Sequence, residues 1–215
     1  MSQRLLLPFD RQMIICGYKN SEYLSYWGYP HYGIDISTIQ GGASDNHTVY
    51  ASGRGAVVAV GKDTRLGYGV CVLYPGCTNG NKTCDLIARY MHMCKCYVKK
   101  GDKVTVSTPI GVEGKEGTVD YHLHLELDTD VNYPRWSPQV RAGLSFWKKG
   151  TDSTLNPSQW LCQTGNRVQI PSVFNPAWLN QEDKELPVVS AATEPYSIEQ
   201  IEKVFSYVLE KMKGE

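Results

Sequence analysis

The chain has 215 residues, which favours one substantial domain with a short appendage over two full-sized domains. Hydrophobic residues make up 41% of it, and its 20 glycines and 11 prolines favour short strands and many turns, so we expect a mainly β protein. Lysine plus arginine and aspartate plus glutamate number 22 each, and this balance leaves no basic surface for a polyanion such as nucleic acid.

The N-terminal segment does not resemble a secretion signal. Its apolar run at residues 5–7 is followed at once by Pro8 and Asp10, so the continuous apolar region of a signal peptide is missing. No apolar stretch reaches the length of a membrane span. We therefore expect synthesis in the cytoplasm and release by a route that the sequence does not encode.

Short strands are predicted along the first two thirds of the chain. Between residues 49 and 112, β-branched runs alternate with glycine turns, for example at 55–61, 68–74 and 103–106, as in an antiparallel sheet. Residues 121–128 (Tyr-His-Leu-His-Leu-Glu-Leu-Asp) alternate polar and apolar side chains, which is the period of a strand with one buried face. The histidines and acidic residues of that segment therefore share one face.

The C-terminal part has a different composition. Charged, small and proline residues without periodicity fill 180–195, which we interpret as a linker or loosely tethered strap. After it, Ser197 and Gln200 fit a capping box, and apolar residues recur at helical spacing as far as Met212. We expect an amphipathic helix at 197–213 that docks on the same chain or on a partner such as a second copy.

Three histidine motifs are candidates for a reacting centre. His31 and Asp35 stand four residues apart around a glycine, and both residue types bind zinc, although such a pair also arises by chance in turns. His122 and His124 project from one face of the predicted strand and can converge on one centre, although such pairs also occur as surface features. His92 follows an apolar strand, where a histidine alone more often packs in the core.

Taken together, the motifs favour catalytic zinc. Four of the five histidines fall in them, only His47 lies outside, and Asp35 supplies an oxygen ligand. Three protein ligands with one open position are typical of catalytic zinc, whereas structural zinc is usually closed by four ligands. The helical His-Glu-x-x-His of thermolysin-type enzymes is not present in the sequence.

The order and spacing of the motifs resemble the lysostaphin-like, or LytM-domain, zinc endopeptidases. Their pattern has a His-x3-Asp, found here at 31–35, a Tyr-x-His at 90–92 and a late His-x-His at 122–124. Further matching segments lie at residues 49–58, 67–69, 98–104, 110–111 and 156–157. The resemblance covers roughly residues 4–161 and implies a small antiparallel β-sheet domain with an open groove.

The resemblance also implies roles for individual residues. His31, Asp35 and His124 would bind one zinc ion per chain. His92 and His122 would line the groove without binding metal, handle protons and stabilise the oxyanion, and which of them is the general base stays open.

The activity that the resemblance implies is zinc-dependent hydrolysis of peptide bonds in bacterial peptidoglycan, in a cross-bridge or a stem peptide. Because a secretion signal is not evident, we expect a phage or prophage lytic enzyme that acts on the cell wall. The alternative is an inactive LytM-like domain that serves as a wall-binding or regulatory scaffold, but such domains typically lose site residues and this chain keeps all five. The oligomeric state stays open.

We assign residues 1–161 to the zinc endopeptidase domain, 162–196 to the strap and 197–213 to the C-terminal helix. Two features depart from the family pattern. Residues 117–122 lack the usual Ser/Thr-Gly, and the insertion at 77–84 carries cysteines at both ends.

Several residues permit two interpretations. Glu126 shares the face of His124 and either orients that ligand or is an ordinary exposed strand carboxylate.

An aromatic cluster near the first motif either walls the groove or packs under the first strand: Tyr23, Tyr26, Trp27, Tyr29 and Tyr32. Four cysteines could form a structural zinc site, but they lack paired Cys-x2-Cys spacing, so buried small residues or redox partners are preferred: Cys77, Cys84, Cys94 and Cys96. With seven cysteines, at least one thiol should be free or intermolecular.

Overall fold

The computed structural model describes residues 2–38, 47–64, 66–132, 152–190 and 206. Its strands are β1 (Leu5–Leu6), β2 (Arg11–Cys16), β3 (Ile34–Ser37), β4 (Thr48–Tyr50), β5 (Gly55–Asp63), β6 (Gly67–Thr78), β7 (Thr83–Met93), β8 (Lys95–Cys96), β9 (Lys103–Val104), β10 (Pro109–Val112), β11 (Leu123–Asp128), β12 (Thr154–Leu155), β13 (Leu161–Cys162) and β14 (Val168–Gln169). Its helices with described bounds are α1 (Ser21–Trp27) and the short 3-10 helices η1 (Pro157–Gln159), η2 (Pro176–Trp178) and η3 (Gln181–Asp183).

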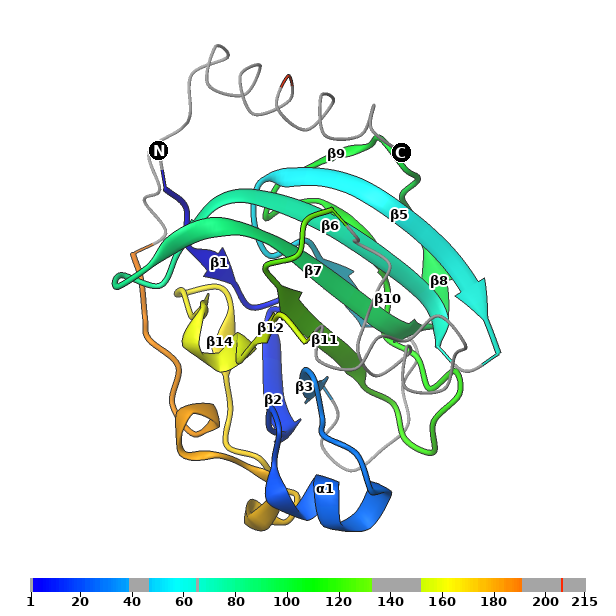
Figure 1. Ribbon diagram of the computed structural model, residues 1–215, viewed down its shortest axis with the longest axis vertical. Coiled ribbons are helices and arrows are strands. Elements are labelled where there is room, and N and C mark those ends of the chain that lie inside the picture. The colour runs from blue at the N-terminus through cyan, green and yellow to red at the C-terminus, as the bar shows by residue number, and fades with distance from the viewer. Residues whose placement is uncertain (1, 39–46, 65, 133–151, 191–205, 207–215) are drawn as a thin grey trace.

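One large, mostly antiparallel sheet organises the molecule. Its strand order is β14-β2-β3-β11-β7-β6-β5-β9, and β12 pairs with β11 beside this path. The long strands β5, β6 and β7 curve across the molecule side by side (Figure 1). A smaller sheet has the order β4-β10-β8, and β1 pairs with β13 in a third. The prediction of a mainly β architecture with antiparallel pairing is confirmed.

The main core contains one face of the central strands. Val70 and Val72 of β6, Ala88 and Tyr90 of β7 and the leucines of β11 are all fully buried. Each buried aliphatic side chain contributes about 1.5–3 kcal/mol relative to an exposed one. β11 differs from the sequence expectation in one respect, because its polar face is buried as well as its apolar face.

The described part of the predicted strap packs against the sheet. β13 pairs with β1 and β14 pairs with β2, while Leu186 is buried in the main core. Two prominent anchors are Asn175, which caps η2, and Asp183, whose carboxylate accepts from Ser158 Oγ at 2.5 Å and from the Asn180 amide at 2.7 Å. The polar and proline-rich composition of this part thus encodes capped turns rather than a loose tether, because each turn satisfies its own backbone groups.

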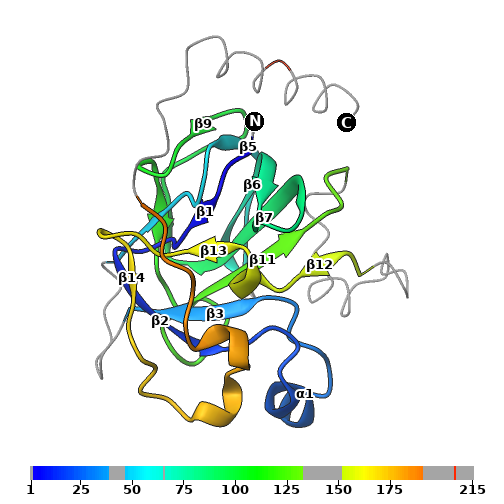
Figure 2. The same ribbon diagram turned by 90° about the vertical axis from the view of Figure 1, so that its left-hand side faces the viewer.

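α1 lies beyond the ends of β2 and β3, beside η2 of the strap (Figures 1 and 2). Asn20 caps its N-terminus, and Gly28, with φ of 78°, ends it in the left-handed region that glycine adopts without strain. The predicted C-terminal helix at 197–213 lies outside the described residues apart from residue 206. Among the described helices, none has the length and apolar character needed to cross a membrane.

Candidate metal centre

The two halves of the candidate centre come from neighbouring strands. His31 precedes β3, Asp35 lies on β3, and His124 lies on β11 directly opposite Asp35 in the antiparallel register. Gly33 lets the first motif approach β11, because a Cβ atom at this position would lie 2.4 Å from the carbonyl oxygen of Leu125. The three residues between His31 and Asp35 therefore allow the imidazole of one and the carboxylate of the other to face the same histidine, His124.

Three donor atoms converge in a small triangle. Nε2 of His31 lies 3.1 Å from Oδ1 of Asp35 and 3.0 Å from Nδ1 of His124, and that Nδ1 lies 2.9 Å from the same Oδ1. Tetrahedral zinc with bonds of about 2.0–2.1 Å separates its ligand atoms by about 3.3–3.4 Å. The observed triangle therefore needs adjustments of only a few tenths of an ångström to accept such an ion.

The hydrogen bonds around the triangle leave lone pairs pointing inward. Nδ1 of His31 lies 2.9 Å from the carbonyl oxygen of Gly17, which cannot donate, so the proton of a neutral His31 ring sits on Nδ1. Nε2 of His124 lies 3.3 Å from Oε1 of the Glu126 carboxylate, so Nε2 donates there. The inner nitrogens of both neutral rings then face each other and the Asp35 carboxylate, an arrangement that suits a cation.

Neighbouring charges shift the pKa values of His124 and Asp35 in opposite directions. Burial disfavours a charged His124, but its contacts with Asp35 and Glu126 outweigh burial and raise the pKa of His124 to about 9. Burial likewise opposes ionisation of Asp35, but the facing His31, His122 and His124 hold the pKa of its carboxyl well below the usual value. Asp35 is thus ready as an anionic ligand near neutral pH.

His122 and His92 stand beside the triangle. Nε2 of His122 lies 3.7 Å from Oδ1 of Asp35, and its Nδ1 donates to the carbonyl of Asp120 at 3.0 Å. The ring centroid of His92 lies 5.0 Å from that of His122 and 6.1 Å from that of His124. The structure therefore brings all five predicted site residues into one cluster.

His92 has an unusual backbone and a neutral ring. Its φ is 66°, a left-handed conformation that is uncommon for residues other than glycine and tends to occur at functional sites. Its Nδ1 donates to the carbonyl of Glu116 at 2.8 Å, which leaves Nε2 as the nitrogen with a lone pair. Burial and the neighbouring His122 and His124 lower the pKa of His92 to about 4, so the ring is uncharged near neutral pH.

Cys16 is also close to His31 but is poorly placed to share an ion with Asp35. Its Sγ lies 3.4 Å from Nδ1 of His31, on the opposite edge of the ring from the nitrogen that faces Asp35. Burial, together with the charges of Asp35 and Asp183, raises the pKa of the Cys16 thiol. Because the His31 nitrogen next to Cys16 is not the one that faces Asp35, Cys16 is not part of the triangle of His31, Asp35 and His124.

The four cysteines considered as a structural zinc site lie far apart. Cys77 and Cys84 face each other across the β6–β7 hairpin, whereas Cys94 and Cys96 follow the other end of β7. At about 3.3 Å per residue, the strand separates Cys84 from Cys94 by roughly 30 Å. One tetrahedral site cannot include all four.

The aromatic cluster near the first motif divides into packed and exposed members. The Tyr23 ring stacks on His31 with centroids 4.4 Å apart and an angle of 25° between the planes. Tyr23 and Tyr32 are buried, whereas Tyr26 and Trp27 of α1 are 72% and 52% exposed. Trp178 of the strap packs edge-on against Tyr23 at 6.1 Å. The packing interpretation therefore holds for Tyr23 and Tyr32, whereas the groove-wall interpretation stays a prediction for the exposed Tyr26 and Trp27.

Three charged residues on the far side of His124 were not singled out as a group from the sequence. Glu126 is fully buried and not an exposed strand carboxylate, and it pairs with the buried Arg89 of β7, which also pairs with Asp128. The sequence carries one signal for this group. Arg89 interrupts the apolar run of β7, and a charge at such a position requires a buried partner.

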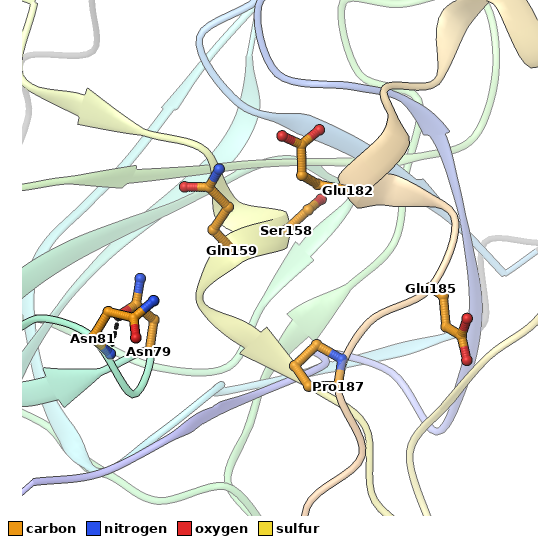
Figure 3. A pocket seen from close by; sticks show the side chains of 7 residues that line it. All are labelled: Asn79, Asn81, Ser158, Gln159, Glu182, Glu185 and Pro187. Atoms are coloured by element: carbon orange, nitrogen blue, oxygen red, sulfur yellow. Dashed lines mark hydrogen bonds between the residues drawn. The ribbon is translucent and has the colours of Figure 1, made fainter.

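A polar hollow lies between the β6–β7 turn and the segments around η1 and η3 (Figure 3). Its lining residues are Asn79, Asn81, Ser158, Gln159, Glu182, Glu185 and Pro187. None of them belongs to the histidine cluster, and the side chains of Glu182 and Glu185 point away from each other in Figure 3.

The chain is similar to known proteins over part of its length. Residues 29–134 match the model of peptidase family M23. The peptidoglycan DD-endopeptidase ShyA of Vibrio cholerae is 36% identical over 99 residues, which are 46% of this chain and 20% of that protein. This chain therefore spans about a fifth of the length of that curated relative.

Among solved structures, the SpoIIQ–SpoIIIAH pore-forming complex has a TM-score of 0.53 at 20% identity, and the match covers 75% of this chain and 92% of the other. This likeness concerns the fold alone. A zinc-containing peptidase from Vibrio cholerae has a TM-score of 0.47 at 26% identity, covering 59% of this chain and 37% of the other. Over residues 29–134 the chain belongs to peptidase family M23, the lysostaphin-like or LytM-type peptidases.

Proposed function

We propose that this protein is a zinc-dependent endopeptidase that cleaves peptide bonds in bacterial peptidoglycan. The observation that carries the proposal is the triangle of inward-facing lone pairs from His31, Asp35 and His124, with two further histidines beside it. A triangle of this size and donor chemistry suits one divalent ion with a position left for a substrate or water.

The residues fit zinc, and each has a separate role in the proposal. His31, Asp35 and His124 hold the ion, and bound zinc supplies Lewis-acid polarisation and lowers the pKa of water. His122 and His92 present Nε2 lone pairs near the centre, since the Nδ1 atom of each ring donates to a backbone carbonyl. Either ring can accept a proton from water and later return it to the leaving amine.

The proposed substrate class is supported by the relative that is named a peptidoglycan DD-endopeptidase. A cross-bridge and a stem peptide are both compatible with the site. The expected setting, a phage or prophage lytic enzyme acting on the cell wall, stays a prediction.

Two measurements on the purified full chain test the proposal. Elemental analysis should find about one zinc per chain, and His124→Ala should lose it because three ligands become two. Mass spectrometry should find peptide fragments released from purified peptidoglycan by the wild type and not by the variant. Zinc binding without any released fragment would instead indicate an inactive wall-binding or regulatory scaffold.

A further inference from the structure

A row of buried charges lies behind His124, on the side away from Asp35. Glu126, Arg89 and Asp128 are 0%, 2% and 0% exposed. They lie on neighbouring strands, because Arg89 of β7 stands directly opposite Glu126 of β11 in the antiparallel register. Asp128 follows two residues later on the same face of β11.

The contacts within the row run in one direction, away from the candidate metal centre. Nε2 of His124 lies 3.3 Å from Oε1 of Glu126, and the other oxygen of that carboxylate lies 3.1 Å from a guanidinium nitrogen of Arg89. The same nitrogen lies 2.8 Å from Oδ2 of Asp128. Oδ1 of Asp128 accepts from Ser153 Oγ at 2.6 Å and from the amide of Asp130 at 2.8 Å.

Stability alone does not explain such a row. Burying an ion costs several kcal/mol in desolvation, and apolar replacement of a whole buried charge cluster is often neutral or stabilising. The polar face of β11 could therefore pack with leucine or valine, as its opposite face does with Leu123, Leu125 and Leu127. Because this buried charge cluster contacts the candidate zinc ligand His124, it points to a role at the metal centre.

We propose that Glu126 is a positioning residue for His124, and that Arg89 holds the Glu126 carboxylate in place. This inference rests on the proposed function, because it concerns how His124 presents its lone pair to zinc. By accepting a hydrogen bond from Nε2, Glu126 keeps the proton of the neutral ring on that atom and leaves Nδ1 free to face Asp35. It also restrains the rotation of the ring.

The contacts within the row predict that the amide variant Glu126→Gln binds zinc less tightly. Arg89 only donates, so it would attract the amide oxygen of the new side chain. The amide nitrogen would then face Nε2 of His124 and donate to it. The proton of the neutral ring would have to move to Nδ1, which would remove the lone pair that the metal needs.

The test measures zinc affinity of the metal-free full chain by competition with a chromogenic chelator. Loss of a group that orients a metal ligand typically costs about 10–100-fold in affinity, and we expect this loss for Glu126→Gln. Glu126→Asp keeps the charge but withdraws the carboxylate by one methylene, so we expect a loss of similar size. The visible spectrum of the cobalt-substituted protein should change in both variants, which a purely structural role would not cause.

Asp128→Asn is the matched control. It makes the same carboxylate-to-amide change in the same buried row but does not touch His124, and Arg89 keeps Glu126 as its partner. We expect zinc affinity close to that of the wild type. We expect Glu126→Gln to fold, because Arg89 keeps Asp128 as its partner. Circular dichroism of the metal-free variants checks that they are folded.

The outcomes separate the two proposals. If the folded Glu126 variants bind zinc as tightly as the wild type, Glu126 does not position His124. If Asp128→Asn weakens zinc binding as much as Glu126→Gln, the total charge of the row matters rather than orientation, and the inference is again overturned. If the wild type itself binds no zinc, the proposed function fails instead.

Discussion

Gly33→Ala tests whether the close approach of the first motif to β11 builds the candidate metal centre. An added Cβ would lie 2.4 Å from the carbonyl oxygen of Leu125 and 2.8 Å from Nε2 of His124, whereas ordinary contacts begin at 3.4 Å. The backbone of β11 cannot rotate away as a flexible side chain can. The two segments must therefore separate by roughly 1 Å, which typically costs about 1–3 kcal/mol in stability.

The same separation should weaken metal binding. His31 and Asp35 lie on one side of the contact and His124 on the other, so the 2.9 and 3.0 Å edges that join them would open to about 4 Å. Zinc bonds of about 2.0–2.1 Å span only about 3.3–3.4 Å between tetrahedral ligands. We expect zinc affinity to fall by about 10–100-fold, the range observed when ligand orientation is lost.

The assay is zinc competition with a chromogenic chelator, together with the melting temperature of the metal-free protein. Gly61→Ala is the matched control, because a Cβ at Gly61 in β5 would meet no atom within 4 Å. The control should leave both quantities unchanged. A folded Gly33→Ala variant that binds zinc as tightly as the wild type would show that the spacing of these two segments does not determine the site.

Three further predictions follow from the structure. His122→Ala and His92→Ala should keep zinc and lose about 10²–10⁴-fold in the rate of peptidoglycan hydrolysis, and wild-type rates in both would refute their proposed role. Leu186→Ala should lower the free energy of unfolding, measured in urea, by about 2–5 kcal/mol without releasing zinc, because Leu186 is 1% exposed in the main core. An unchanged free energy of unfolding would mean that the strap does not pack there. Removal of residues 191–215 should leave the zinc content unchanged, since every proposed ligand lies upstream, and loss of the metal would contradict the proposed domain of residues 1–161.

The sequence was sufficient to identify the family and to locate the candidate residues. The spacing of the first motif, the His-x-His and the intervening Tyr-x-His are local patterns, and the structure brings all five side chains into one cluster. Alternation over residues 121–128 also predicted which side chains share a face, because successive residues of a strand point to opposite sides. The assignment of zinc ligands stays a prediction of that pattern.

Only the tertiary structure shows which other residues contact the five candidate site residues. Periodicity predicts the face of a strand but not its neighbour, so the sequence could not show that β7 lies beside β11 and sets Arg89 against Glu126. For the same reason Glu126 could be exposed or buried until its neighbours were known. The packing of residues 162–190 was hidden too, because it depends on short capped turns and on contacts with β1 and β2 that lie more than a hundred residues away in the chain. Such long-range pairings leave no local pattern, since each partner satisfies its hydrogen bonds only after the whole sheet has formed.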